Sequence, residues 1–518
     1  MKTHCLLFLP VFVLFAGSSS TAAVLTWDAG NVANGATIDA AGGTWDLSAT
    51  SLWNCAGSNV NWTQTSATAA LNSAIFAGTD GTYSVMVGTG LATSALTFSN
   101  TGYTLGAAAS QIITNTGNTA VAIGKTATLG TNVKVSATGA NTIGGGGTLN
   151  IAGSGGSYSG NSSNQTTIVE GATVDVGTNG TFSHTSSLFV GNSSAGATLK
   201  VSGGSVTVSN GNNLAIGNSA NNATGIVTLT TGTITLSATA GTGLRFGGTT
   251  ALTGNSGTFN LDGGTLTTST IYENAGNTGV TSTFNFNGGI LKAAVSNTSF
   301  MTGLNSANVK LNGAKIDSNG FDITIGQALI HDATLGATVD GGLTKSGTGT
   351  LSLTAANTYT GFTSISGGVI DVGTLDGSGD SLGAGGLLLS NGAVLQGNGA
   401  LTRSLSGVAT AGNGQVSSIN GGFSARGGQL TVDLGTLSLN NGGYKFGTGL
   451  VFGSATADSL VKLTSNIDFG GANRTITVNS GIGGDSAELS GNISDGSTSL
   501  LGFSKGGTGL LTLSGTNT

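Results

Sequence analysis

The sequence has few charged residues and a single proline. Charged residues make up 7% of its 518 residues, against roughly 25% in an ordinary globular protein. After residue 23 no apolar run approaches the ~18 residues that a membrane-spanning helix needs. Disorder is also excluded, because hydrophobic residues make up 38% of the chain and recur in short, regular groups. The composition therefore predicts a β-protein whose outer faces carry Thr, Ser and Asn instead of charge.

Residues 1–23 are predicted to be a secretory signal peptide, with a polar start at Lys2, an apolar core from Cys5 to Ala16 and small residues at the cleavage positions. A buried first helix is the alternative. Cleavage of the signal peptide would remove the only proline and one of the few basic residues. The whole sequence is already acidic, with a formal net charge of −6. Because nucleic-acid binding needs a basic stripe, no nucleic-acid partner is expected.

Removal of this segment leaves Cys55 as the only cysteine, because the other is Cys5. Cys55 is therefore predicted to be a buried, inert thiol without an intrachain disulfide. Pairing between two chains and action as a nucleophile are the alternatives, although no histidine lies near Cys55 in the sequence.

All four tryptophans lie between Trp27 and Trp62. The stacked coils of a solenoid end in an apolar surface that must be covered, and large aromatic side chains cover it with few residues. Residues 24–105 are therefore predicted to form a Trp-rich N-terminal cap, with short strands such as 83–87 and 95–98. A Trp-lined sugar site is the alternative.

The sequence then repeats itself. A third short strand recurs between the copies, as at 188–191 and 214–217, and several copies continue after a Gly pair. The interval between copies is roughly 20 to 30 residues, the length of one coil of a β-helix. The copies begin at Gly147, Gly171, Gly196, Gly225, Gly257 and Ser282.

These strands alternate apolar residues with Thr, Ser or Asn, which places one face inside and one outside. Three strands joined by Gly or Asn corners make one coil, and about 20 to 25 coils stacked ~4.8 Å apart would hold the chain. We therefore predict an all-β, right-handed parallel β-helix over 106–342, continuing over 374–502. A β-sandwich does not explain the repeat, and Gly at this density would cost a helix ~1 kcal/mol per position.

Residues 343–373 combine an alternating strand at 350–353 with a corner at 357–361. The pattern closely resembles the autotransporter-associated β-strand repeat, also called the passenger-associated transport repeat, and Phe362 departs from it where the family has a small residue. A second copy begins at 503 and stops at 518, so the chain is expected to be a fragment of a longer product. The matching positions are Lys345, Gly347, Gly349, Thr350, Leu351, Leu353, Asn357, Thr358, Tyr359, Gly361, Thr363, Ile365, Gly368 and Val372.

This resemblance implies a passenger of the type V secretion route, secreted or displayed at the outer membrane of a Gram-negative-type bacterium. A structural or adhesin-like role follows from it. The implied partners are the outer-membrane translocation machinery or a C-terminal β-barrel missing from this sequence. Surface glycans or host and cell surfaces are further partners of this class.

No catalytic, cofactor-binding or metal-binding residue is predicted, and the chain is not expected to be an enzyme. His184 and His331 are interpreted as turn or surface residues. The enzyme alternative, a β-helical polysaccharide lyase or hydrolase, needs clustered carboxylates. Binding of Ca²⁺ by Asp371, Asp376 and Asp380 is a further alternative. It is disfavoured because the sequence has no repeated Gly-Gly-x-Gly-x-Asp pattern. The densest group of acids is Asp317, Asp322, Asp332 and Asp340, with Lys315 and His331 nearby.

Overall fold

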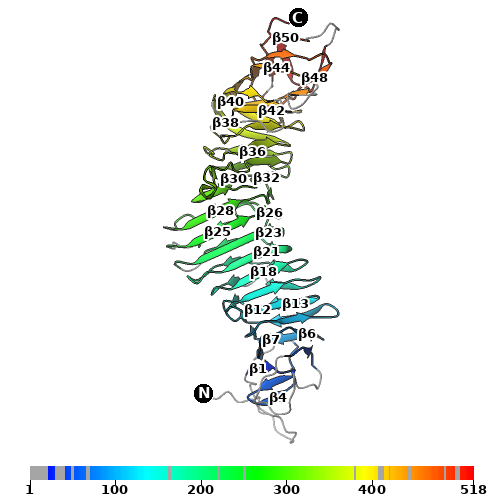
Figure 1. Cartoon of the computed structure of the whole chain (residues 1–518), viewed down its shortest axis with the longest axis vertical. Coiled ribbons are helices and arrows are strands. Elements are labelled where there is room, and N and C mark those ends of the chain that lie inside the picture. The colour runs from blue at the N-terminus through cyan, green and yellow to red at the C-terminus, as the bar shows by residue number, and fades with distance from the viewer. Residues whose placement is uncertain are drawn as a thin grey trace. The chain divides into compact units, whose positions relative to one another are not determined.

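The chain forms two units, each a parallel β-solenoid, with about 16 turns in all (Figure 1). Unit 1 contains residues 1–260, 264–266 and 273–282, and unit 2 contains 261–263, 267–272 and 283–518. The predicted signal peptide lies outside the described residues except for positions 22 and 23. The computed structural model describes residues 22–29, 41–47, 52–65, 71–160, 165–218, 221–248, 253–377, 381–406, 414–418, 420–439, 446, 449–483, 486–495 and 502–518.

Each turn of unit 1 contributes a strand to each of three faces, and strands on a face pair in parallel with their copies in neighbouring turns. The first face contains β5 (Ser73–Phe76), β8 (Ala95–Phe98), β11 (Thr119–Val121), β14 (Asn141–Gly144), β17 (Thr166–Ile168), β20 (Leu188–Val190), β22 (Leu214–Ile216) and β24 (Leu244–Phe246). The second contains β6 (Tyr83–Val87), β9 (Tyr103–Gly106), β12 (Thr126–Leu129), β15 (Thr148–Ile151), β18 (Thr173–Gly177) and the first halves of β21 (Thr198–Val208) and β23 (Thr224–Leu236). The third contains β7 (Leu91–Thr93), β10 (Gln111–Asn115), β13 (Val133–Ala137), β16 (Ser157–Gly160), β19 (Thr181–His184) and the second halves of β21 and β23.

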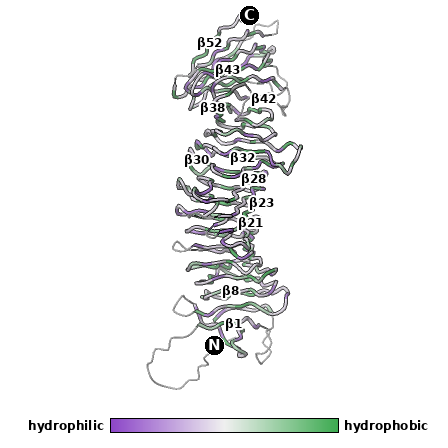
Figure 2. The backbone as a smooth tube through the Cα atoms, turned by 90° about the vertical axis from the view of Figure 1, so that its left-hand side faces the viewer, coloured by the Kyte–Doolittle hydropathy of each residue, from purple (hydrophilic) through white to green (hydrophobic). Residues whose placement is uncertain are grey.

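Apolar residues of successive turns stack into continuous inner columns. Leu149, Val174, Leu199 and Val227 lie opposite one another on the second face and are fully buried. Each such side chain contributes roughly 1.5 to 3 kcal/mol through burial. The parallel β-helix predicted from the alternation is thereby confirmed, and Figure 2 shows hydrophobic and hydrophilic residues alternating along the rungs.

The predicted number of coils was too high. Opposite residues Asp175 and Lys200 are 25 residues apart, but Thr228 and Asn260 are 32 residues apart. Several turns are long because their corners carry outward loops that add residues without adding a rung. The chain therefore makes about 16 turns instead of the predicted larger number.

The N-terminal segment contains β1 (Val24–Trp27), β2 (Gly43–Trp45), β3 (Trp53–Cys55) and β4 (Ser58–Val60). β3 pairs antiparallel with both β1 and β4, which interrupts the parallel order at this end of unit 1. All four indole rings are 0–2% exposed and contact one another at centroid distances of 4.8–5.2 Å. This buried aromatic cluster fits the predicted Trp-rich cap. A Trp-lined sugar site is wrong, because the four rings are buried.

Cys55 is not the unpaired thiol that the sequence predicted. It takes part in a disulfide. The prediction depended on the loss of Cys5 with residues 1–23, and Cys5 lies outside the described residues.

His184 lies in the core of unit 1, so its interpretation as a turn or surface residue is wrong. Its side chain is 1% exposed, in the inner column directly beside Gly160. A Cβ on Gly160 would come within 1.9 Å of the imidazole, so only glycine leaves room for the ring. Nε2 lies 2.5 Å from the Thr166 hydroxyl, and burial lowers the pKa of His184 to about 4.

Unit 1 is therefore expected to lose stability as the pH falls from 6.5 to about 4. The unfolded imidazole binds a proton near pH 6.5, whereas the folded one resists it, so this stabilisation is complete above pH 6.5 and is lost on acidification. The loss is on the order of 3 kcal/mol. Urea unfolding followed by Trp emission, which reports on unit 1 alone, should show an acid slope that His184→Leu lacks. An equal slope in both proteins would contradict the assignment.

Unit 2 repeats the three-stranded turn. Its first face contains β30 (Asn297–Thr302), β33 (Ile323–Ile325), β36 (Thr350–Leu353), the first halves of β38 (Val369–Gly377), β40 (Val394–Thr402) and β43 (Gly422–Asp433), then β45 (Gly449–Phe452), β48 (Arg474–Val478) and β51 (Phe503–Gly506). The second halves of β38, β40 and β43 continue with β46 (Val461–Leu463), β49 (Ser486–Leu489) and β52 (Leu510–Leu513). The other rows are β29 (Ile290–Ala293), β32 (Ala314–Asp317), β35 (Leu343–Ser346), β37 (Thr363–Ile365), β39 (Leu387–Leu389), β42 (Gln415–Ser418) and β41 (Ser404–Leu405); β31 (Ser306–Val309) with β34 (Leu329–His331); and β44 (Thr436–Ser438), β47 (Asn466–Asp468) and β50 (Ile493–Ser494).

Four further strands contain the residues at which the units divide: β25 (Ser256–Leu261), β26 (Thr265–Thr268), β27 (Ile271–Glu273) and β28 (Thr281–Phe286). A 3-10 turn, Ala333–Leu335, is the one helical segment in the described part of the chain. No helix among those residues has the length and apolar character to cross a membrane.

Candidate functional site

The repeat-like segment 343–373 supplies β35, β36 and β37 and the start of β38. In β36 the side chains of Leu351 and Leu353 point inward and are 0% and 1% exposed. Leu351 lies between Ile323 of the preceding turn and Ile370 of the next. The wall strand predicted at 350–353 is confirmed, and it joins the turns on both sides through apolar contacts.

Lys345 closes a corner of this turn from inside the solenoid. The residue is fully buried, and its Nζ donates hydrogen bonds to the carbonyl oxygens of Ser346 at 2.8 Å, Gly347 at 2.8 Å and Gly367 at 3.1 Å. Burial lowers the pKa of Lys345 to about 8. The lysine satisfies carbonyls that would otherwise be buried without partners.

Asn357 connects three successive turns. Its Oδ1 accepts a hydrogen bond from the Leu329 N–H at 2.8 Å, and its Nδ2 donates to the Ser381 carbonyl at 2.6 Å. Leu329 belongs to the preceding turn and Ser381 follows the repeat. A single side chain therefore fixes the spacing of the turns before and after it.

The second repeat-like segment, 503–518, reproduces both contacts. Lys505 Nζ donates to the carbonyls of Gly506 at 3.2 Å and Gly507 at 2.7 Å. Asn517 Oδ1 accepts from the Ile493 N–H at 3.1 Å, as Asn357 does from its own preceding turn. The repeat is therefore defined by a corner-closing lysine and a turn-bridging asparagine as well as by its strands.

Asp340 is a buried carboxylate held by the corner of the repeat. Its side chain is fully buried, and its two oxygens accept five hydrogen bonds. Burial alone would raise the pKa of Asp340, but the donors around it hold the pKa below its usual value. Asp340 thus fastens the turn before the repeat to the corner 357–361. The donors are Gly342 N–H (2.9 Å), Gly361 N–H (2.9 Å), Thr360 N–H (2.7 Å), Thr360 Oγ1 (3.0 Å) and His331 Nδ1 (2.8 Å).

Both ring nitrogens of His331 contact the loop 332–340 that follows it in the chain. Nδ1 contacts Asp340 at 2.8 Å, and Nε2 lies 3.1 Å from the carbonyl oxygen of Gly336. Only the doubly protonated ring can donate to both acceptors. The hydrogen bond to Asp340, followed by that to Gly336, raises the pKa of His331. Both ring nitrogens are thus occupied by structural contacts.

The four acids singled out from the sequence do not form one cluster. Asp317 contacts Lys292, Asp332 contacts Lys310, and Asp322 accepts the Thr350 N–H at 2.8 Å. Asp340 is occupied as described above. Among the described residues no group of three or more His, Cys, Asp or Glu is placed to hold a metal ion. Each acid therefore serves a separate contact between turns.

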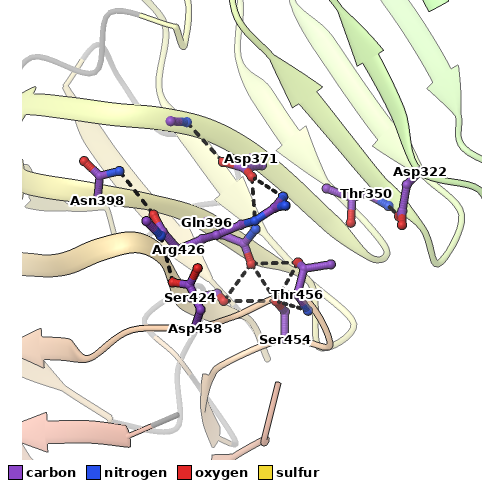
Figure 3. A network of polar contacts seen from close by, with 12 residues as sticks. Asp322, Thr350, Asp371, Gln396, Asn398, Ser424, Arg426, Ser454, Thr456 and Asp458 are labelled. Atoms are coloured by element: carbon purple, nitrogen blue, oxygen red, sulfur yellow. Dashed lines mark hydrogen bonds and ion pairs between the residues drawn. The ribbon is translucent and has the colours of Figure 1, made fainter. Parts of the chain in front are cut away.

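Gln396 is the centre of a buried polar network on the first face of unit 2 (Figure 3). Its Nε2 donates to Asp371 at 3.1 Å, and Arg426 Nη1 also donates to Asp371 at 3.1 Å. Its Oε1 accepts from the hydroxyls of Ser424 (3.0 Å), Ser454 (2.6 Å) and Thr456 (3.0 Å). Asp371 is thus used by a glutamine and an arginine, while the Asp376 side chain and Asp380, its partners in the predicted Ca²⁺ set, lie outside the described residues.

A groove of about 330 Å³ lies beside this network. It follows the corners that precede the first-face strands of several turns, and glycines form much of its lining. A second groove, of about 290 Å³, lies on unit 1 and is lined by Ile226 and by small and hydroxyl-bearing residues of 171–258. The first groove is lined by Gly320, Asp322, Thr348, Gly349, Thr350, Gly368, Val369, Gly392, Val394, Gly453, Ser454, Ala455, Thr456 and Asn479.

The sequence did not indicate the roles of Asp340 or Gln396. Gln396 meets Thr456 across 60 residues, and no local pattern pairs them. The lysine and asparagine contacts could have been found, because both residues recur in register in the two repeat-like segments.

Residues 343–372 match the family described as Passenger-associated-transport-repeat. Comparison with curated proteins and with solved structures gives no match. The match covers the turn that contains Lys345, Leu351 and Asn357, and the surrounding units have the β-solenoid architecture of a passenger. The chain therefore carries a passenger-associated transport repeat within a β-solenoid, an arrangement that fits the passenger of an autotransporter.

Proposed function

We propose that this chain is a secreted or surface-displayed β-helical passenger with a structural, adhesin-like role, exported by a type V route to the outer surface of a Gram-negative-type bacterium. Its partners in export are the outer-membrane translocation machinery or a C-terminal β-barrel. Once displayed, it meets surface glycans or other cells.

The observation that carries this proposal is the way the repeat turn is fastened. Asn357 binds the turns before and after it, and Asp340 of the preceding turn enters the repeat corner. These contacts are complete only when three turns have stacked. A chain that emerges turn by turn would gain them in order, and each turn also buries apolar area at about 25 cal/mol per Å². Stacking outside the membrane would thus favour outward movement.

Labelling of intact cells tests the proposal. The loop 333–339 is exposed at most of its positions, so an epitope inserted there should be accessible to antibody and to added protease in cells that express the full gene product. A periplasmic protein serves as the control and should stay protected until the cells are lysed. Labelling that requires lysis would overturn the export proposal.

A further inference from the structure

The groove beside Gln396 has an apolar floor. Thr350, Val369 and Val394 lie opposite one another at the starts of β36, β38 and β40. The two valines are 8% and 2% exposed. Because neighbouring rungs lie ~4.8 Å apart, the floor repeats at this interval along the groove. Because these three residues expose little surface, the polar rim supplies most of the contacts that a ligand lying across the rungs can make.

The rim of the groove is polar and carries no cation. Its side chains include the exposed carboxylate of Asp322, the exposed hydroxyl of Thr348 and the amide of Asn479. No Lys, Arg or His is among the described residues that line it. An apolar floor with a few polar groups is the usual composition of a ligand site, and these groups favour a neutral ligand rich in hydroxyls over an anionic one.

One wall of the groove is a loop held in place across two turns. β43 runs from the first face to the second without a break, but the equivalent strands of the next turn, β45 and β46, are separated by residues 453–460. This loop folds back onto Gln396, which is fully buried (Figure 3). Continuous strands would need neither the loop nor the buried glutamine. The departure from regular rungs therefore shapes the groove and orders its wall before any ligand arrives.

We propose that this groove is a binding site for a neutral glycan, whose rings lie over Val369 and Val394 and whose hydroxyls contact Asp322, Thr348 and Asn479. The site supplies an adhesive contact that the repeat itself does not. The four buried tryptophans take no part in it.

Binding of defined hexasaccharides to the purified full chain tests the site. The panel consists of cello-, chito-, malto- and mannohexaose, with hexagalacturonate as the acidic member. At least one neutral hexasaccharide should bind, and hexagalacturonate should not. Thr348→Trp fills the groove from an exposed position and should weaken binding roughly tenfold or more. Thr344→Trp, on the outer side of β35 and outside the lining, is the matched control and should bind as the wild type does.

Three outcomes would overturn the assignment: no binding of any neutral hexasaccharide, equal binding of hexagalacturonate, or wild-type binding by Thr348→Trp. Thermal unfolding of both variants establishes that they are folded. Because the assay uses purified protein, failure of the export proposal would leave its result unchanged.

Discussion

Replacing Leu351 and Leu353 by aspartate is expected to unfold the repeat turn and to reduce display at the cell surface. Both side chains are buried in inner columns, between Ile323 and Ile370 and beside Ile325. Two unpaired carboxylates there would cost more than about 5 kcal/mol, a large part of the stability of a typical domain. Limited proteolysis of the purified chain should cut near this turn, and cell-surface labelling should fall about fivefold or more.

Thr344→Asp is the matched control for this double variant. Thr344 lies in the neighbouring strand β35 and points outward, opposite Lys315. A carboxylate placed there should leave protease resistance and display unchanged. If the leucine variant unfolds and is still displayed at the wild-type level, stacking is not needed for export. If the leucine variant stays folded, the assignment of the Leu351 and Leu353 side chains to the inside of the solenoid is wrong.

The strand positions could be predicted from the sequence because hydropathy alternation is a local property. The pattern identifies the segments beginning at Leu188, Leu214 and Leu244 as copies of one strand, and they lie opposite one another in β20, β22 and β24. The alternation at 350–353 likewise assigned Leu351 to the inner side. A polar residue at an inward position would interrupt this alternation and could therefore be detected from the neighbouring residues in the sequence.

The polar contacts between turns could not be predicted in the same way. Alternation says that a polar residue faces outward, but not which residue of another turn it meets. Gln396 faces outward as this rule says, but the loop 453–460 covers it and buries its amide, which alternation does not predict. Asp340 was identified only as a member of an acidic group, since its partners Thr360 and Gly361 lie in the next turn. His184 was misplaced because only the absence of a side chain at Gly160 makes room for it.

Replacing Asp340 by alanine is expected to separate the repeat corner from the preceding turn. Alanine leaves five donors without their acceptor in a buried site, and loss of one partner of such a buried charged group costs roughly 3 to 5 kcal/mol. Asp340→Asn keeps the shape but places an amide NH₂ either toward His331 and the Thr360 N–H or toward the Gly342 and Gly361 N–H groups, so it should also destabilise. Hydrogen exchange at Gly342, Thr360 and Gly361 should accelerate in both variants.

The pH dependence of this exchange tests whether the ionised pair of Asp340 and His331 holds the corner. The pKa of His331 is raised above 6.5, so its stabilisation is complete below pH 6.5 and is lost as the pH rises through the folded value. The pKa of Asp340 is lowered below 3.8, so its part is present above pH 3.8 and is lost as the pH falls through the folded value. In the wild type, protection relative to the intrinsic exchange rate should therefore be greatest between pH 3.8 and pH 6.5. Asp340→Asn should show no such maximum. Asp433→Asn, at an exposed position of unit 2 whose carboxylate accepts the Gly435 N–H, should keep the wild-type profile. A variant of Asp340 that retained the maximum would show that the corner of the repeat is held by other contacts.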